Sequence, residues 1–170
     1  KVVHCPRSNL GKGVTKTPQM LEMGISVGLG TDGTAHSGLS MFKEITAFKH
    51  SQIVSWGVPY ADNAVMPAKT LINIATYGGA KALGLADEIG TLEVGKKADL
   101  VIVDIDQPHL QPTYNLINSL MEAGESADVK SMMVDGRWLM KDRHVLTLDE
   151  ERLLFEGKES LKEISKRIKS

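Results

Sequence analysis

The sequence predicts a mixed α/β fold, and three observations support this prediction. Two short apolar runs near the start of the chain, at residues 1–6 and 25–30, flank a segment with helix signals. An Asp-Gly pair stands between two strand-like runs at residues 129–143, which is a strong hairpin signal. From residue 147 onward, apolar residues recur at helical spacing among many charges.

The first unit of this fold is a strand, a short helix and a second strand. The run KVVHCP at residues 1–6 predicts a buried strand, which its proline ends. Thr17 followed by proline marks a helix start, and Gly24 is typical of the residue just after a helix. The run ISVGLG at residues 25–30 predicts the next buried strand. This order predicts one right-handed crossover unit of a parallel sheet.

Two helices are expected next. Residues 39–56 carry apolar side chains near helical spacing and predict an amphipathic helix, which Gly57 ends. A second helix is expected to start near Pro67. The pair Gly78-Gly79 is expected to interrupt that second helix.

From about residue 88 the pattern changes to a mainly β part. Residues 89–104 hold two apolar runs around a Gly-Lys pair and predict a hairpin-like element. A short helix at residues 114–124 and the Asp135-Gly136 hairpin follow. Thr147, with Glu150 three residues on, forms a capping box that opens the last helix. The chain is therefore expected to have three parts, at residues 1–88, 89–146 and 147–170.

Bulk composition narrows the classes of function. Hydrophobic residues make up 42% of the 170 residues, which is enough for a packed core. The formal net charge is −1, so nothing favours nucleic acid or an anionic membrane as a partner. Cys5 is the single cysteine, which excludes an internal disulfide and fits a reducing cytoplasm. No apolar run approaches the length of a membrane span, so we expect a cytoplasmic protein.

The stretch GLGTDG at residues 28–33 fits two chemical interpretations. Its G-x-G-x-x-G spacing after a strand is a dinucleotide-binding fingerprint. Such a site needs the glycine turn to open a helix directly, so that the helix N-terminus faces the pyrophosphate. The next convincing helix starts only near Leu39, and this context argues against a dinucleotide site. The other interpretation makes Asp32 a metal ligand, against the simpler one of a carboxylate that caps a turn.

Four motifs, in this order, resemble the amidohydrolase superfamily. They are VVHCPRSN at residues 2–9, GLGTDG at 28–33, GGAKALGL at 78–85 and IGTLEVGKKADLVIVD at 89–104. The chain is most similar to the chlorohydrolase and S-adenosylhomocysteine/methylthioadenosine deaminase branch. The resemblance runs from Val2 to about Asp149, so it covers almost the whole sequence.

The resemblance implies a particular α/β architecture. In that family a (β/α)8 TIM barrel is joined to a small β domain. Residues 1–88 would then be the C-terminal part of the barrel, with its last two strands and the helices that follow them. Residues 89–146 would be the C-terminal segment of the small β-sandwich domain. The missing N-terminal half of the barrel would be a required partner of this chain.

The resemblance also gives Asp32 two roles, metal ligand and catalytic residue. It would lie at the C-terminal end of the last barrel strand, on the face where barrel active sites lie. A Zn2+ or Fe2+ ion lowers the pKa of bound water to about 7. A carboxylate beside it can act as general base and then as general acid. The implied reaction is hydrolytic deamination of a purine-type or related heterocyclic substrate, with dechlorination of a triazine as an alternative.

The chain by itself is expected to lack most metal ligands. The family supplies the others from histidines of earlier strands, including an H-x-H motif, and none of the five histidines here forms one. The isolated chain is therefore expected to be inactive and not to hold the metal alone. A non-catalytic binding or assembly module derived from the same barrel is the alternative function. A homo-oligomer through the apolar face of the last helix also stays open.

Four further residues are candidates for contact with the substrate. His4 ends the first strand, where a hydrogen-bonded structural histidine is the alternative. Ser8 and Asn9 follow it and could equally cap the loop. His36 comes shortly after Asp32, and its alternative is an exposed loop residue.

Overall fold

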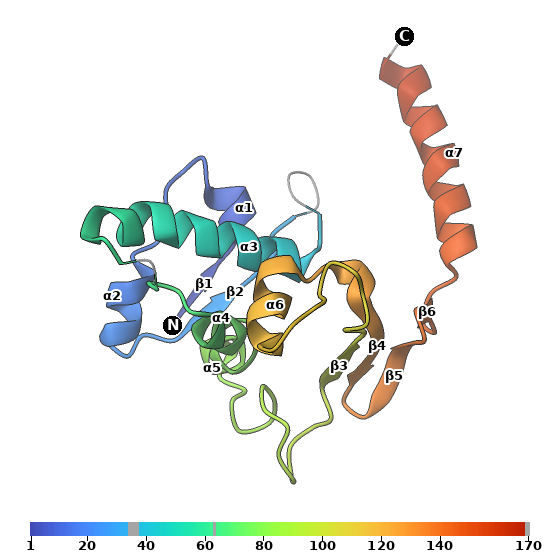
Figure 1. The fold of residues 1–170 in the computed structure, drawn as a ribbon. Helices are drawn as coiled ribbons and strands as arrows, with labels where there is room; N and C mark the ends of the chain where they lie inside the picture. The colour runs from blue at the N-terminus through green and yellow to red at the C-terminus, as the bar shows by residue number, and fades with distance from the viewer. Residues whose placement is uncertain (34–37, 63, 169–170) are drawn as a thin grey trace.

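The computed structural model describes residues 1–33, 38–62 and 64–168. In these ranges the chain forms a two-stranded parallel sheet surrounded by helices and a separate four-stranded antiparallel sheet (Figure 1). A long final helix, α7, extends from the second sheet to the C-terminus (Figure 1). The predicted mixed α/β class is confirmed, although two strands do not make a closed barrel.

The parallel sheet consists of β1 (Val2–His4) and β2 (Val27–Leu29). Between them the chain forms α1 (Pro6–Asn9) and α2 (Thr17–Glu22). The predicted order of strand, helix and strand is therefore confirmed. Gly24 follows α2 with a φ of 73°, a conformation that costs glycine little because it has no Cβ.

Helix α3 (Met41–Gln52) covers the parallel sheet. The Ser40 side chain caps its start by accepting the Lys43 N–H at 3.3 Å. A π-helical turn η1 (Ile53–Gly57) and a 3-10 turn η2 (Val58–Tyr60) end it, near the predicted boundary. A buried hydrophobic cluster joins side chains of α3 to others from β2, from the helical segment that starts near residue 67, and from α6. Its members are Val27, Ile45, Phe48, Met66, Leu71, Ile74 and Met121.

The glycine pair in the next helical segment does not interrupt it, contrary to the prediction. Helix α4 (Ala68–Asn73) passes through a π-helical turn η3 (Ile74–Gly78) directly into α5 (Gly79–Leu83). Both glycines have helical backbone angles. Glycine is present at residue 78 because the helix packs closely against β2. A Cβ on Gly78 would lie 2.6 Å from the Val27 carbonyl oxygen of β2, which is closer than real Cβ contacts.

The antiparallel sheet has the order β3-β4-β5-β6. Its strands are β3 (Leu100–Val103), β4 (Val129–Val134), β5 (Arg137–Lys141) and β6 (His144–Val145). The predicted hairpin is confirmed, because β4 and β5 pair across a turn whose two residues, Asp135 and Gly136, both have positive φ.

The hairpin predicted at residues 89–104 is wrong. Residues 89–99 form turns, and β3 pairs with β4 instead of with a preceding strand. The Lys96 ammonium holds these turns by donating to the Ala86 carbonyl oxygen at 2.8 Å and to the Thr91 hydroxyl at 2.6 Å. The Asp99 carboxylate accepts the Asp135 N–H at 2.7 Å and so ties the start of β3 to the β4–β5 turn.

Two helices complete the chain. Helix α6 (Leu116–Ala123) matches the short helix predicted at residues 114–124. Helix α7 (Glu150–Ile168) starts later than the predicted cap at Thr147. The Asp149 carboxylate caps it instead, by accepting the Arg152 N–H at 3.0 Å, because a side chain adjacent to the first turn reaches its free N–H groups.

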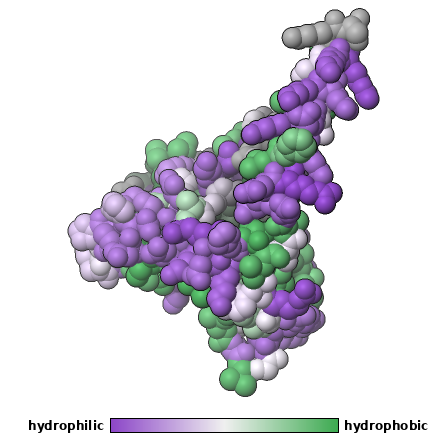
Figure 2. Space-filling view, turned by 90° about the vertical axis from the view of Figure 1, so that its right-hand side faces the viewer, coloured by the Kyte–Doolittle hydropathy of each residue, from purple (hydrophilic) through white to green (hydrophobic). Residues whose placement is uncertain are grey.

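Helix α7 stands clear of the rest of the molecule. Figure 2 shows it as a projection whose visible side is mostly hydrophilic. Its apolar side chains Leu154, Leu161 and Ile168 are 65%, 63% and 80% exposed, so this face packs against nothing in the described ranges. None of the described helices is both long enough and apolar enough to cross a lipid bilayer.

The imidazole of His4 belongs to the packing layer between the parallel sheet and α3. It is 6% exposed, and its ring meets the Phe48 ring edge-on, with 6.0 Å between the ring centroids. Burial lowers the pKa of His4 below its ordinary value of 6.5, because a charged ring is poorly solvated there. His4 is therefore neutral at pH 7.

Two neighbouring glycines offer a matched test of the close packing. We expect Gly78→Ala to lower the free energy of unfolding by about 1–3 kcal/mol, because the new methyl group meets the Val27 carbonyl oxygen. Gly79→Ala should be neutral or stabilising by up to about 1 kcal/mol, since its Cβ meets only the Ile74 carbonyl oxygen at 3.7 Å. Urea unfolding measures both, and equal effects would contradict the packing role of Gly78.

The burial of His4 predicts a pH dependence of stability. Below pH 6.5 the unfolded chain binds a proton at His4 more readily than the folded chain, so the free energy of unfolding should fall as the pH drops from 6.5 toward the lowered folded-state pKa. Above 6.5 this contribution is fully present. Urea unfolding at several pH values gives the slope of the unfolding free energy against pH. This slope should be shallower for His4→Asn, whereas the exposed control His144→Asn should keep the wild-type slope.

Candidate active site at the ends of the parallel strands

The carboxyl ends of β1 and β2 meet at one edge of the parallel sheet. The register pairs Val2 with Val27 and His4 with Leu29. One further backbone bond extends this pairing, from the Gly30 N–H to the His4 carbonyl oxygen at 2.9 Å. The residues that follow each strand, Cys5 to Asn9 and Thr31 to Gly33, therefore start from the same edge, which is where α/β enzymes hold their reacting groups.

Asp32 leaves this edge in an unusual conformation. Its φ is 54°, in the left-handed region that few residues other than glycine, asparagine and aspartate occupy. The side chain is exposed, and its carboxylate has no hydrogen-bond or ion-pair partner among the described residues. None of the described N–H groups donates to this carboxylate, as the simpler interpretation of a turn cap would require. Within the described residues the carboxylate is accessible to a ligand.

The predicted substrate-contacting residues have different environments. His4 is buried against Phe48, which fits the structural alternative for this residue. The Asn9 amide donates to the Cys5 carbonyl oxygen at 2.9 Å and so stabilises its own loop. The Ser8 hydroxyl is buried without a hydrogen-bond partner. His36 lies outside the described residues.

Gly28 and Gly30, before Asp32, allow close packing, whereas a Cβ on Gly33 would meet nothing within 4 Å. Strand β2 ends at Leu29, and in the part of the chain that the structure describes the next helix starts at Met41, so none of the described helices opens directly from the glycine turn. A Cβ on Gly28 would lie 2.9 Å from the Gly79 Cα, and one on Gly30 would lie 3.1 Å from the Cys5 sulfur. These close approaches explain why the strand carries glycine.

The sequence analysis missed one buried carboxylate beside this edge. Glu44, in the first turn of α3, is 0% exposed. Its Oε2 accepts the backbone N–H of Arg7 at 2.9 Å, and its Oε1 lies 4.0 Å from the Arg7 guanidinium. The signal was available, because Glu44 stands between Met41 and Phe48 on the apolar face of the helix, where a charged residue is out of place.

A single carboxylate is what the described residues offer to a metal ion at this edge. They contain no group of three or more His, Cys, Asp or Glu side chains placed to hold one. Asp32 itself fits the role of a metal ligand, because its carboxylate is exposed, is not engaged in a hydrogen bond, and is an oxygen donor that zinc accepts. A catalytic zinc site usually has three protein ligands, so Asp32 would need others from outside this set.

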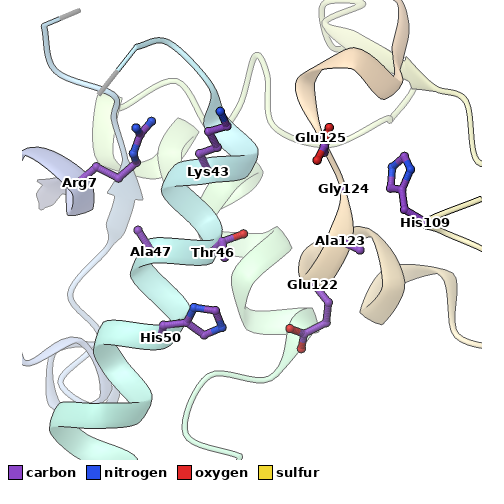
Figure 3. Close-up of a pocket in the computed structure, with 10 residues that line it drawn as sticks. All are labelled: Arg7, Lys43, Thr46, Ala47, His50, His109, Glu122, Ala123, Gly124 and Glu125. Atoms are coloured by element: carbon purple, nitrogen blue, oxygen red, sulfur yellow. The ribbon is translucent and has the colours of Figure 1, made fainter. Parts of the chain in front are cut away.

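A pocket lies elsewhere, between α3 and the end of α6 (Figure 3). Its volume is about 530 Å3, and Asp32 does not line it. His50 and Glu122 point into the gap from opposite sides (Figure 3). Glu122 is already paired with Lys49, and the His109 ring is held by Asp128 at 3.0 Å, so these side chains have partners of their own.

Curated relatives of this chain are deaminases. A 5-methylthioadenosine/S-adenosylhomocysteine deaminase of Desulforudis audaxviator is 42% identical over 166 residues, which are 96% of this chain and 38% of the relative. The enzyme of the same description from Acetivibrio thermocellus is 39% identical over 98% of this chain and 38% of its own length. A 5'-deoxyadenosine deaminase of Methanosarcina acetivorans is 40% identical over 96% of this chain and 37% of its own length. The chain thus spans little more than a third of these relatives.

Solved structures of two enzymes share the fold of this chain. An adenosine deaminase from Xanthomonas campestris with bound zinc matches 97% of this chain with a TM-score of 0.89 and 31% identity, over 37% of that enzyme. An atrazine chlorohydrolase from Arthrobacter aurescens complexed with zinc matches with a TM-score of 0.76 and 24% identity, which shows a shared fold alone. The model of the amidohydrolase family matches residues 1–139. This chain therefore belongs to the amidohydrolase family.

Proposed function

We propose that this chain supplies the metal-binding aspartate and part of the substrate pocket of a hydrolytic deaminase that acts on an adenine-type ring. The observation that carries the proposal is Asp32, whose carboxylate follows the end of a parallel strand and has no partner among the described residues, in a chain up to 42% identical to deaminases. The compounds in the names of these deaminases all contain an adenine ring, which carries an exocyclic amine.

The proposed architecture extends the observed one. Residues 1–88 would provide the last two strands of a barrel and their helices, residues 89–146 a segment of a small β domain, and residues 147–170 the terminal helix. Within the described residues each strand of the parallel sheet pairs with one other strand, so the opposite side of each strand keeps backbone N–H and C=O groups that no strand pairs with. These groups are suited to pairing with further strands, which supports an N-terminal barrel half as the partner.

Asp32 would hold the metal through its carboxylate and move one proton. Zinc, when bound at such a site, activates water as a nucleophile near neutral pH. An Asp32 carboxylate oxygen would take a proton from the attacking water and pass it to the exocyclic nitrogen of the substrate. The C–N bond would then break with its electron pair on nitrogen, and ammonia would leave. The remaining hydroxyl proton would move to the adjacent ring nitrogen, so that the ring carbon keeps the oxygen as a carbonyl group. Water and the amine are converted to carbonyl and ammonia, so the reaction balances without a redox partner.

The neutral state of His4 is compatible with this chemistry. A neutral ring at the end of β1 adds no positive charge beside the metal site. The His4 ring stacks edge-on against Phe48, so its position is set by the core and does not depend on a ligand. Ser8 and His36 remain proposed substrate contacts, whereas Asn9 is proposed to stabilise α1, the short helix that carries Ser8.

A chimera tests the proposed activity. This chain would replace the matching region of the Acetivibrio thermocellus relative. The match includes 98% of this chain, so almost all of it would be transferred. We expect the chimera to bind zinc and to release ammonia from 5-methylthioadenosine or S-adenosylhomocysteine. A chimera that folds and binds zinc but deaminates neither compound would favour the non-catalytic binding module instead.

Asp32→Asn in that chimera tests the role of the carboxylate. We expect kcat to fall by at least about 10²-fold, together with a loss of zinc, because the amide neither transfers the proton nor binds the metal as well. Asparagine tolerates the left-handed conformation of Asp32, so the backbone should be preserved. Asp87→Asn, an exposed aspartate after α5, is the matched control. Unchanged kcat and zinc content in Asp32→Asn would contradict the assignment.

A further inference from the structure

The contact between α1 and α3 contains a buried carboxylate that the proposed reaction does not yet use. Glu44 is completely buried at the start of α3, the helix that follows the Asp32 segment. Its partner is the backbone of Arg7 in α1, the helix that follows β1. The bond therefore links the segments that leave the two parallel strands at the same edge of the sheet.

The backbone bond is the stronger of the two interactions that Glu44 makes with Arg7. The Arg7 N–H donates to Oε2 at 2.9 Å, whereas the guanidinium lies 4.0 Å from Oε1, which is too far for a hydrogen bond. Oε1 itself is buried without a hydrogen-bond partner. A carboxylate is costly to bury in this way, so its retention at a core position points to a specific task.

The task follows from the start of α1. This helix begins at Pro6 after Cys5, and no side chain of its own caps it. The free N–H of its second residue, Arg7, is satisfied by Glu44 from another helix. Glu44 thus caps α1 from outside and fixes its position relative to α3.

We infer that Glu44 is a positioning residue: by holding the Arg7 amide it sets α1, which carries Ser8 and Asn9, at a fixed place relative to Asp32. The inference rests on the proposed deamination, in which α1 borders the substrate. Small displacements of groups around a reacting centre cost large factors in rate, so the anchor should influence turnover without touching the substrate.

The anchor can first be tested on this chain alone, without any activity. Amide hydrogen exchange followed by NMR should show the Arg7 N–H protected in the wild type. Glu44→Ala should speed its exchange by about tenfold or more, because the acceptor is lost. Glu44→Gln, which keeps a side-chain oxygen, should retain most of the protection. Glu88→Ala, which removes an exposed carboxylate paired with Lys97, should leave it unchanged. Equal Arg7 exchange in the wild type and Glu44→Ala overturns the anchor.

The effect on turnover is tested in the chimera, per folded and zinc-loaded molecule. We expect Glu44→Ala to lower kcat/KM by about 10–10²-fold at unchanged zinc content. Glu44→Gln should restore activity to within about fivefold of the wild type, since it keeps the acceptor. A lower melting temperature with unchanged kcat/KM means a purely structural role and overturns the inference, as do equal losses in both variants.

Failure of the proposed function gives a different result from failure of the anchor. If the unmodified chimera folds and binds zinc but is inactive, the deaminase proposal is wrong, and with it the effect of Glu44 on turnover. The exchange of the Arg7 amide then still decides whether Glu44 fixes α1. An active chimera with an unprotected Arg7 amide contradicts the anchor and leaves the deaminase proposal standing.

Discussion

The parallel pairing of β1 and β2 is the constraint on which the rest of the structure depends. Because the two strands run in the same direction, the residues after His4 and after Leu29 leave the sheet at one edge. The bond from the Gly30 N–H to the His4 carbonyl oxygen continues that pairing up to the point where Asp32 turns out into solvent. An antiparallel arrangement would have placed these two ends on opposite sides of the sheet.

Three ionisable side chains near this edge lie in three different environments. His4 is buried against Phe48 and is neutral. Glu44 is equally buried, but it accepts the Arg7 N–H and lies 4.0 Å from the Arg7 guanidinium. Asp32 is exposed, and its carboxylate has no hydrogen-bond partner among the described residues. The Asp32 carboxylate is therefore accessible to a ligand, whereas the Glu44 carboxylate links α1 to α3.

Much of the fold could be predicted because its signals are local. The strand ending at Pro6, the helix ending at Gly24 and the Asp135-Gly136 turn each depend on the conformational limits of one or two residues. Gly78-Gly79 was misinterpreted because glycine weakens an isolated helix, whereas here the absence of a Cβ allows the helix to contact β2. That contact is between residues far apart in sequence, and no local pattern contains it.

The site was predictable to a similar extent. Asp32 follows a strand in a recognisable motif, so its place at the strand end could be expected, although its partner-free carboxylate could not. The spacing of Glu44 between Met41 and Phe48 placed it on the apolar face, but the spacing could not show its hydrogen-bond partner. That partner is the Arg7 amide, which belongs to another helix. The hairpin prediction at residues 89–104 was wrong because the apolar side chains of residues 89–99 have a strand-like pattern, whereas the strand that follows them, β3, pairs with β4.

The main-chain contacts at Gly28 and Gly78 have a consequence for how this protein can change over evolution. The spacing between β2 and the helical segment behind it is set by backbone atoms, with no side chain in between. Mutations in the loops beyond the strand can therefore accumulate without shifting the platform from which the aspartate projects.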